Sequence, residues 1–347
     1  MKSDLPLPQV SKLCGCESVS FLETIQSLWS GYGEIARVQL HPGLTTAIVK
    51  HVNSPNNRQH KYGWSGDVSH QRKLSSYDNE MAWYGGLAKQ CDDSCHIANL
   101  IGASKSDGQW LIVLEDLDAS GFPLRRESVN DGQLNACLAW LASFHATFLH
   151  DAQATTSPQG QDQLWPIGTY WHLATRPDEY EQMAESDLKK HAGAIDQRLN
   201  DCRYKTLVHG DAKLANFCFA KDDRVAAVDF QYVGTGCGIK DVAYFVSSCL
   251  DESECETREQ EVLDRYFGFM REKLDAALLD EVEAEWRDLY AFAWADFYRF
   301  LAGWSPGHWK MHRYSERLAS LAIARIRKCL VSYVIQISSV RKHGSII

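Results

Sequence analysis

Two short apolar runs that end in polar side chains constrain the fold most. The first, "LVHGDAKLANF" (207–217), begins like a β-strand and then places a His, an Asp, a Lys and an Asn within eight positions. The second, "VAAVDF" (225–230), contains Asp229, eighteen residues after Asp211. This separation fits two short antiparallel strands with a tight connection, which would bring the polar groups together. The crowding predicts either a solvated loop or a site that holds a hydroxyl, a phosphate and a metal.

Sequence patterns on either side of this hairpin predict a β-rich first part and a helical second part. Two β-branched runs, at 33–40 and 44–52, are separated by the turn signal "HPG" and predict a hairpin. A short buried strand is predicted at 110–117. The lobe boundary then falls after residue 117, which gives an N-lobe of 1–117 and a C-lobe of 118–347. Helices are predicted at 72–90, 131–149, near 178–200 and through much of 240–340, with a loop at 53–70 and a C-terminal helix packed on the domain.

Charge and composition limit the class of partner. The net charge is −9, with 36 Lys and Arg against 45 Asp and Glu, whereas general nucleic-acid binders cluster basic residues. The N-terminus lacks the apolar run of a signal peptide, and no stretch approaches the roughly 20 apolar residues of a membrane span. The eleven Cys are therefore expected to be free thiols in a reducing compartment. We expect a cytoplasmic protein that acts on a small molecule, without nucleic-acid binding or membrane insertion.

Phosphoryl transfer requires the residue types that the polar hairpin supplies. The reaction depends on a carboxylate that faces the attacking hydroxyl, on oxygen ligands for Mg²⁺ and on a cation for the donor phosphates. Asp211 and Asn216 are five residues apart, the spacing of a catalytic loop whose Asp meets the hydroxyl and whose Asn binds the metal. Lys213 is placed to reach the transferred phosphate, and Asp229 is placed to bind the metal beside Asn216. His209 is interpreted as a structural residue of the loop.

The string "HGDAKLAN" followed by "VDFQ" resembles the aminoglycoside phosphotransferase and choline kinase-like superfamily. The resemblance is nearest the choline kinase-like and ecdysteroid kinase-like branch and covers about residues 28–305. These proteins are small-molecule kinases, so the resemblance implies an α+β, protein-kinase-like two-lobe fold with a β-rich N-lobe and a mainly helical C-lobe. It also implies ATP and Mg²⁺ as cofactors and a small-molecule hydroxyl as the acceptor.

The same resemblance assigns roles to residues far from the hairpin. Lys50 in "AIVK" looks like the lysine of the third strand, and Glu80 looks like its partner on the following helix. Glu115 and Leu117 in "LEDL" look like the hinge that meets adenine through its backbone. Asp241 would support the catalytic loop rather than react.

Two positions depart from the pattern of the superfamily. Only Gly31 and Gly33 stand before the first predicted hairpin, not a full G-x-G-x-x-G, so the cover over the phosphates is looser or differently shaped. The metal motif ends in Gln231 rather than Gly, so no activation switch is inferred there. Three alternatives stay open: a dinucleotide fingerprint at "GTGCG" (234–238), a metal hydrolase built on "HGD", and a nucleotide-binding pseudokinase with a regulatory role.

The acceptor is not identified by the sequence, because several aromatic groups suit more than one alcohol. The stripe in 285–304 predicts a packed helix, with an aromatic acceptor pocket and the carboxylate of Asp296 as the alternative. Choline-like amino alcohols, aminoglycosides and hydrophobic alcohols are all compatible with these residues. The stripe consists of Trp286, Tyr290, Trp294 and Phe297, and similar candidates in the 156–173 loop and just after it are Trp171, His172 and Arg176.

Overall fold

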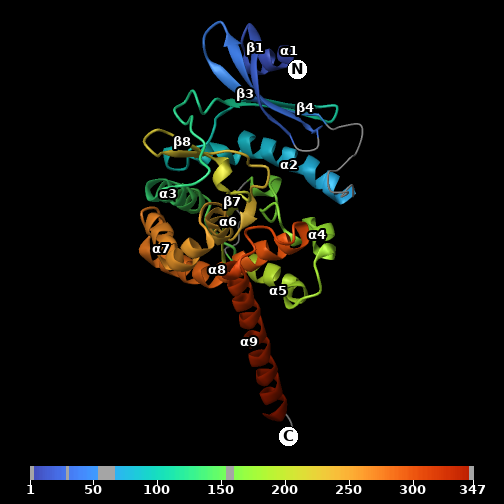
Figure 1. The fold of residues 1–347 in the computed structure, drawn as a ribbon, viewed down its shortest axis with the longest axis vertical. Coiled ribbons are helices and arrows are strands. Elements are labelled where there is room, and N and C mark those ends of the chain that lie inside the picture. The colour runs from blue at the N-terminus through green and yellow to red at the C-terminus, as the bar shows by residue number, and fades with distance from the viewer. Residues whose placement is uncertain (1–3, 29–30, 54–66, 154–159, 344–347) are drawn as a thin grey trace.

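An antiparallel five-stranded sheet forms the N-terminal part of the computed structural model, which describes residues 4–28, 31–53, 67–153 and 160–343. The strands follow the order β1-β2-β3-β5-β4, and the predicted hairpin is confirmed by the antiparallel pairing of β2 with β3. Figure 1 shows this sheet at one end of the molecule, with the helical part beyond it. The strands are β1 (Ser18–Ser27), β2 (Gly33–His41), β3 (Thr46–Asn53), β4 (Leu100–Ser106) and β5 (Gln109–Glu115).

Helix α1 (Leu7–Cys14) covers the sheet and closes a small core of its own. Its Val10 is fully buried and packs with Val38 and Val49, whose neighbours along each strand are less buried. Strands β2 and β3 were recognisable in the sequence as β-branched runs on either side of a turn signal. Strand β1 was not predicted, because most of its residues are exposed and it carries no alternating pattern.

Helix α2 (Asp67–Gly85) lies between the sheet and the helical part, as Figure 1 shows. Its Tyr77 contacts Trp110 of the sheet with ring centroids 5.7 Å apart, while its Trp83 stacks on Phe230 at 5.0 Å. Helix α2 thus packs against the sheet through Tyr77 and against the main core of the helical part through Trp83. The prediction of a loop over 53–70 is wrong from Asp67 onward, where the helix begins, and 54–66 lie outside the described residues.

The C-terminal part is mainly helical, which confirms the predicted α+β class with a β-rich first part and a mainly helical second part. The helix predicted near 178–200 is in fact two helices, because the Ser186 hydroxyl accepts a hydrogen bond from Lys189 N–H and begins a new one. The helices are α3 (Asp131–Thr147), α4 (Pro177–Gln182), α5 (Asp187–Asn200), α6 (Ile239–Cys249), α7 (Glu252–Arg271), α8 (Ala276–Trp304) and α9 (Arg313–His343).

Five short strands lie within the helical part and frame the polar hairpin. Strand β8 pairs antiparallel with β9 in the register Phe217↔Ala227, as the spacing of the two apolar runs predicted. Strand β10 pairs antiparallel with β7, so "GTGCG" is not the parallel unit of a dinucleotide site. The strands are β6 (His150–Asp151), β7 (Tyr204–Val208), β8 (Phe217–Phe219), β9 (Val225–Ala227) and β10 (Gly234–Gly236); the 3₁₀ turns are η2 (Leu87–Gln90), η3 (Asp93–Cys95), η4 (Gln161–Gln163), η5 (Leu173–Thr175) and η6 (Leu214–Asn216).

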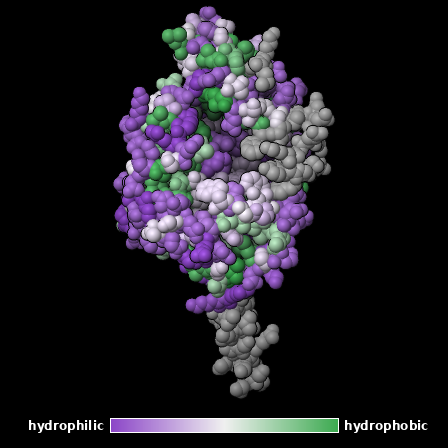
Figure 2. All heavy atoms as spheres, in the orientation of Figure 1, coloured by the Kyte–Doolittle hydropathy of each residue, from purple (hydrophilic) through white to green (hydrophobic). Residues whose placement is uncertain are grey.

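Helix α9 begins on the body of the molecule and then leaves it. Its Tyr314, Leu318 and Ala322 are buried in the main core, whereas Figure 1 shows the remainder extending away. The prediction that the C-terminal helix packs on the domain is therefore wrong for its second half. Hydrophilic side chains cover most of the face shown in Figure 2, with scattered apolar groups. No helix among the described residues is both long and apolar enough to cross a membrane.

Candidate active site

The loop that follows β7 is fixed by backbone geometry and by one buried carboxylate. Gly210 has a φ of +78°, and a Cβ there would lie 2.2 Å from the carbonyl oxygen of Tyr232, so only glycine fits. The Asp241 side chain accepts hydrogen bonds from the backbone N–H of His209 at 2.5 Å and of Gly210 at 3.0 Å. His145 lies 3.2 Å from the same carboxylate. Asp241 thus holds the turn from beneath, in the position that the resemblance implied.

His209 connects the two polar runs, and both of its ring nitrogens are engaged in hydrogen bonds. Its Nε2 lies 3.0 Å from the carbonyl oxygen of Val228, and its Nδ1 accepts from the N–H of Asp211 at 3.3 Å. These partners assign the neutral tautomer with the proton on Nε2. The imidazole is buried, so it positions Asp211 against the strand end before Asp229 and is structural, as the sequence suggested.

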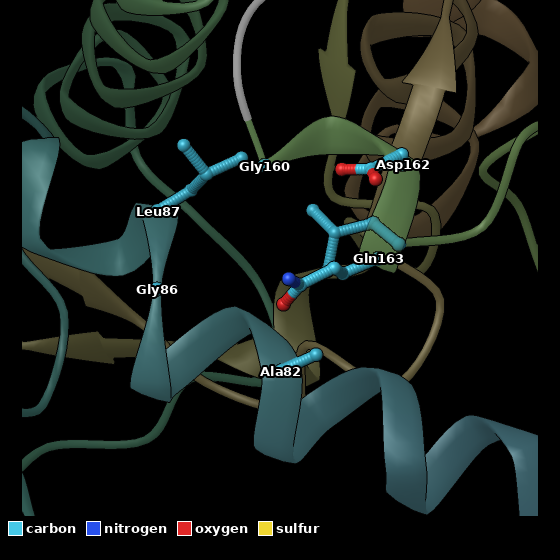
Figure 3. Close-up of a pocket in the computed structure, with 7 residues that line it drawn as sticks. Ala82, Gly86, Leu87, Gly160, Asp162 and Gln163 are labelled. Atoms are coloured by element: carbon cyan, nitrogen blue, oxygen red, sulfur yellow. The ribbon is translucent and has the colours of Figure 1, made fainter.

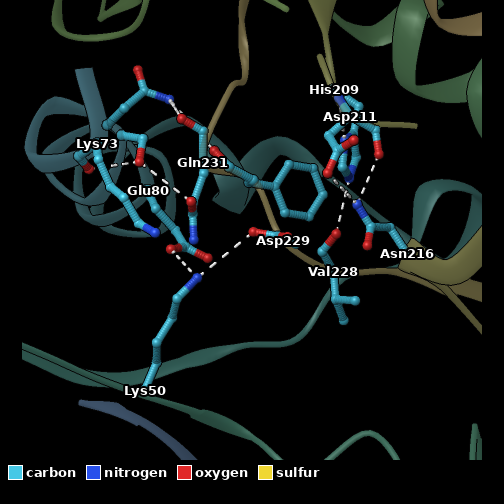
Figure 4. Close-up of polar contacts among 12 residues, drawn as sticks. Lys50, Lys73, Glu80, His209, Asp211, Asn216, Val228, Asp229 and Gln231 are labelled. Atoms are coloured by element: carbon cyan, nitrogen blue, oxygen red, sulfur yellow. Dashed lines mark hydrogen bonds and ion pairs between the residues drawn. The ribbon is translucent and has the colours of Figure 1, made fainter. Parts of the chain in front are cut away.

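Asp211 presents one carboxylate oxygen to its neighbours and leaves the other without a partner. Its Oδ2 lies 2.8 Å from Lys213 Nζ. The same oxygen accepts a hydrogen bond from Asn216 Nδ2 at 3.0 Å, and Figure 4 shows these two side chains together. Its Oδ1 is buried and has no hydrogen-bond partner among the described residues. Burial raises the pKa of the Asp211 carboxyl, and the nearby charge of Asp229 adds to the rise, while Lys213 opposes it. A buried acceptor atom of this kind is suited to a substrate hydroxyl.

Asp229 lies beside Asn216 because the β8–β9 hairpin closes there. The N–H of Val228 donates to the carbonyl oxygen of Asn216 at 3.0 Å. Asp229 has a φ of +70°, a left-handed conformation that costs a non-glycine residue of order 1–3 kcal/mol and that clusters at functional sites. Burial works against ionisation, but the cations of Lys50 and Lys213 outweigh it and lower the pKa of Asp229. The carboxylate is therefore kept charged.

Lys50 joins the sheet to helix α2 and to the metal motif. Its Nζ lies 2.7 Å from Glu80 Oε2 and 3.6 Å from Asp229 Oδ1, and Figure 4 shows the ammonium between the two carboxylates. Lys50 and Glu80 are 5% and 2% exposed, so neither charge would be tolerated without the other. Burial lowers the pKa of Lys50, but the two carboxylates outweigh it and raise the pKa overall.

A second contact that the sequence did not reveal fixes α2 on the metal motif. Asn79, one residue before Glu80, donates from Nδ2 to the carbonyl oxygen of Val233 at 2.9 Å and of Phe230 at 3.4 Å. Gln231 accepts from the hydroxyl of Ser76 at 3.3 Å, so the residue that departs from the superfamily pattern contacts the same helix. An Asn next to a predicted ion-pair Glu was the available signal, but no spacing rule distinguishes it from an exposed helical Asn.

The predicted glycine turn lies between β1 and β2. Gly33 has a φ of +130°, and a Cβ there would lie 2.0 Å from the carbonyl oxygen of His51 on β3. Gly31 also has a positive φ, +74°, with open space around it, and 29–30 lie outside the described residues. Glycine is therefore required at Gly33 for close approach of two strands, and at Gly31 for the turn itself.

The predicted hinge follows β5 and has one free backbone donor. The N–H of Glu115 donates to the carbonyl oxygen of Asn99 at 2.9 Å, and the carbonyl oxygen of Leu117 accepts from the N–H of Phe122 at 2.8 Å. The N–H of Leu117 has no partner among the described residues. The Glu115 side chain bonds Asn99 and Ser120 and is occupied. Only the backbone of this segment is thus available to a ligand.

The donors around Asp229 fit a hard cation such as Mg²⁺. Asn216 donates hydrogen bonds from Nδ2 to Asp211. Its amide carbonyl oxygen accepts no hydrogen bond from any described residue and is available to a metal. Asp229 is charged and its side chain is 38% exposed. Mg²⁺ takes one or two protein oxygen ligands together with waters and substrate phosphates. No group of three or more His, Cys, Asp or Glu side chains suited to a metal occurs within the described part of the chain.

Several residues proposed from the sequence for an acceptor pocket are buried structural groups. Asp296 is fully buried, and it lies 2.6 Å from Arg299 NH2 and accepts from Trp171 Nε1 at 2.9 Å. The alternative that Asp296 binds the acceptor is therefore wrong. Three members of the aromatic stripe pack in the main core, as expected for a packed helix, and only Phe297 belongs to a different cluster. Those three are Trp286, Tyr290 and Trp294.

A cavity of about 430 Å³ lies between α2 and the segment around η4 (Figure 3). Its walls include Ala82 and Leu87 of the α2 region and Asp162 and Gln163 of the facing turn. None of the candidate catalytic, nucleotide-binding or metal-binding residues lines it. It is therefore separate from the site described above.

Residues 169–278 match the model of the Ecdysteroid kinase-like family. The matched segment contains the catalytic loop, the β8–β9 hairpin and Asp241, and it confirms the suspected superfamily. No curated protein matches the chain.

Solved structures of small-molecule kinases resemble the chain at low sequence identity. A microcompartment-associated aminopropanol kinase is 15% identical, with 90% of this chain and 93% of that one covered and a TM-score of 0.46. An ethanolamine kinase of Plasmodium vivax is 12% identical, with 88% and 81% covered and a TM-score of 0.49. The choline kinase LicA of Streptococcus pneumoniae is 13% identical, with 91% and 95% covered and a TM-score of 0.43.

Proposed function

We propose that the protein is an ATP-dependent phosphotransferase that moves the γ-phosphate to a hydroxyl of a small molecule. The observation that carries the proposal is the unpartnered, buried Oδ1 of Asp211 beside Lys213, Asn216 and Asp229. A solvated loop would leave such an atom in water, whereas this one is enclosed and fixed in direction. We also propose that residues 1–117 bind the nucleotide and that residues 118–347 carry the catalytic loop and the acceptor site.

Asp211 would orient the acceptor hydroxyl and take its proton late in the transfer. Its raised pKa makes it a better proton acceptor than an ordinary carboxylate, while the charge of Lys213 opposes the rise. The same Lys213 would hold the γ-phosphate, since its side chain is 38% exposed although its ammonium touches Asp211. Orientation and proton acceptance would then come from one rigid loop.

Nucleotide and metal would be held by groups from both lobes. Lys50, fixed by Glu80, would hold the α- and β-phosphates, with the Gly31–Gly33 turn above them. The free N–H of Leu117, with the backbone of Glu115, would meet the adenine. Asn216 and Asp229 would bind Mg²⁺, which when present neutralises phosphate charge during transfer.

A pseudokinase that binds nucleotide and regulates a partner is the second candidate. It would need a missing or misplaced catalytic group. The Asp211, Asn216 and Asp229 side chains are all present and adjacent, which favours an active enzyme over this candidate.

The test compares acceptor-dependent ADP release by Asp211→Asn and by the wild type over a panel of alcohols, amino alcohols, aminoglycosides and sterols. Removing a positioned acid–base group should lower kcat about 10²–10⁴-fold. Asp222→Asn, an exposed carboxylate on the β8–β9 connection, is the matched control and should leave kcat unchanged. Retained activity in Asp211→Asn would reject the mechanism.

A further inference from the structure

Lys310 is a buried cation without a carboxylate partner. It lies between α8 and α9, is 8% exposed, and makes no ion pair with any described residue. Its Nζ lies 3.4 Å from the hydroxyl of Ser247, a weak contact for an ammonium. Buried charges in proteins are normally paired, so a lone ammonium indicates a partner that is not part of the chain.

Aromatic rings surround this ammonium on several sides. Its Nζ lies 4.9 Å from the ring centroid of Tyr244 and 5.4 Å from those of Phe297 and Trp309. Such faces attract a cation, but they supply no full negative charge. Burial lowers the pKa of Lys310 to about 8, and the charge of Asp211 opposes the shift.

The position of Lys310 relative to the reaction follows from two interactions. Lys310 contacts Ser247, and the hydroxyl of the next residue, Ser248, accepts a hydrogen bond at 2.8 Å from the N–H of Leu214, three residues after Asp211. The phenol of Tyr244, against which Lys310 packs, interacts with the Asp211 carboxylate and hydrogen-bonds the hydroxyl of Tyr170 at 3.3 Å. These contacts place Lys310 near the loop that carries Asp211, where we expect the acceptor hydroxyl.

A continuous aromatic path connects that place with the surface. Tyr244 contacts Phe297 at 4.9 Å between ring centroids, Phe297 contacts Phe300 at 6.4 Å, and Phe300 stacks on Trp304 at 5.6 Å. The outer end is open, because Trp304 is 38% exposed and Trp309, beside Lys310, is 62% exposed. We call Tyr170, Tyr244, Phe297, Phe300, Trp304 and Trp309 the aromatic path.

Apart from Asp211, which is reserved for the hydroxyl, the described carboxylates near these aromatic rings already have partners. Asp296 is engaged by Arg299 and Trp171, as described above. Glu179 is 2% exposed and lies 2.9 Å from Arg176 NH1. Asp196 lies 3.4 Å from His172 Nε2. An amine brought along the aromatic path would meet the ammonium of Lys310 without a free counter-charge.

We propose that the acceptor is an alcohol with an apolar body and an anionic group, and that Lys310 determines this specificity by pairing with the anion. The inference rests on the proposed function and names the substrate class of the same site. The apolar body would lie on the aromatic path, the hydroxyl would reach Asp211, and the anion would supply the missing partner of Lys310. Lys310 contacts the acceptor and takes no part in the proton transfer.

The experiment uses acceptors that differ only in charge. Para-substituted benzyl alcohols and a hydroxysteroid acid series are each prepared with a carboxylate, with the neutral amide, and with an amine in its place. Acceptor-dependent ADP release and acceptor binding by calorimetry are measured for the wild type, Lys310→Met and Lys310→Arg. Lys221→Met, an exposed lysine on the β8–β9 connection, is the matched control. Thermal melting confirms that each variant is folded.

The proposal predicts that the carboxylate is preferred over the amide and the amine by about tenfold or more, as expected for one charge-assisted hydrogen bond. Lys310→Met should remove the preference by raising the KM of the carboxylate with KM for ATP unchanged, while Lys310→Arg retains it. Equal use of the three acceptors, or a preference for the amine, overturns the proposal. Carboxylate-selective binding without any turnover would support the role of Lys310 and reject the proposed phosphotransferase function. The experiment therefore distinguishes failure of one proposal from failure of the other.

Discussion

At the scale of the residue, the metal motif depends on one strained aspartate. Asp229 combines a φ of +70° with a lowered pKa, and the cations that lower its pKa are Lys50 and Lys213. A conformation of this kind persists only when the surroundings hold it. Here the β8–β9 hairpin on one side and Lys50 on the other do so. The charge of Asp229 is thus available at neutral pH without any further deprotonation.

Asp229→Asn should weaken the binding of Mg·ATP, because the substitution keeps the shape but removes the only charged ligand of the predicted metal site. The melting temperature is measured with and without Mg·ATP, and the increase seen for the wild type should be reduced. Asp222→Asn serves as the control, since it removes a carboxylate of the same hairpin that is exposed. An unchanged increase for Asp229→Asn would exclude Asp229 as a ligand.

At the scale of the element, helix α2 connects the two lobes by contacts on both of its sides. It brings Glu80 to Lys50, and through Asn79 it binds the backbone of the segment that follows the metal motif. Gln231 contacts the same helix through Ser76. A Gly at that position would lose this contact, which gives the departure from the superfamily pattern a structural reason.

Asn79→Ala should loosen α2 and so raise the KM for ATP as well as lower stability. Loss of the amide leaves buried carbonyl oxygens without a donor, which costs about 1–3 kcal/mol of unfolding free energy. Denaturant unfolding and the KM for ATP are compared with those of Ser75→Ala, an exposed position on the same helix. A stability equal to the wild type would show that the Asn79 contacts are not required.

At the scale of the whole molecule, a cluster of charges ties the sheet to the connection between the lobes. Arg37 of β2 lies 2.8 Å from Asp116 and also pairs with Asp118 and Glu23. Asp116 is 4% exposed and accepts a second hydrogen bond, from the hydroxyl of Thr46, at 2.7 Å. The predicted hinge is thereby anchored to strands β2 and β3 of the sheet.

Arg37→Met should destabilise the protein, because it leaves the buried Asp116 carboxylate without its cation. The loss is expected to be at least about 1–3 kcal/mol of unfolding free energy, the cost of an unpaired buried polar group. Arg125→Met is the comparison, since Arg125 pairs with Asp118 but is half exposed. If both variants unfold at the same denaturant concentration, the Arg37–Asp116 pair has no special role.

The sequence predicted the residues whose spacing is local. Asp211, Asn216 and Asp229 lie on one hairpin, so their proximity follows from a chain reversal that apolar strands and a tight turn already indicate. Lys50 and Glu80 could be paired only through the resemblance. The N-terminal strand β1 was missed because most of its residues are exposed. The C-terminal helix was placed on the body, although Figure 1 shows its second half extending away from it.

The amino-acid sequence by itself determined the class of reaction proposed here, because a catalytic loop and its metal ligands are close along the chain. Only the tertiary structure decided that the aromatic stripe packs in two buried clusters. Asp296 and Lys310 both stand among aromatic residues in the sequence, yet folding pairs the first with Arg299 and leaves the second without a carboxylate. Pairing of buried charges is set by contacts between distant segments, and no local pattern specifies it.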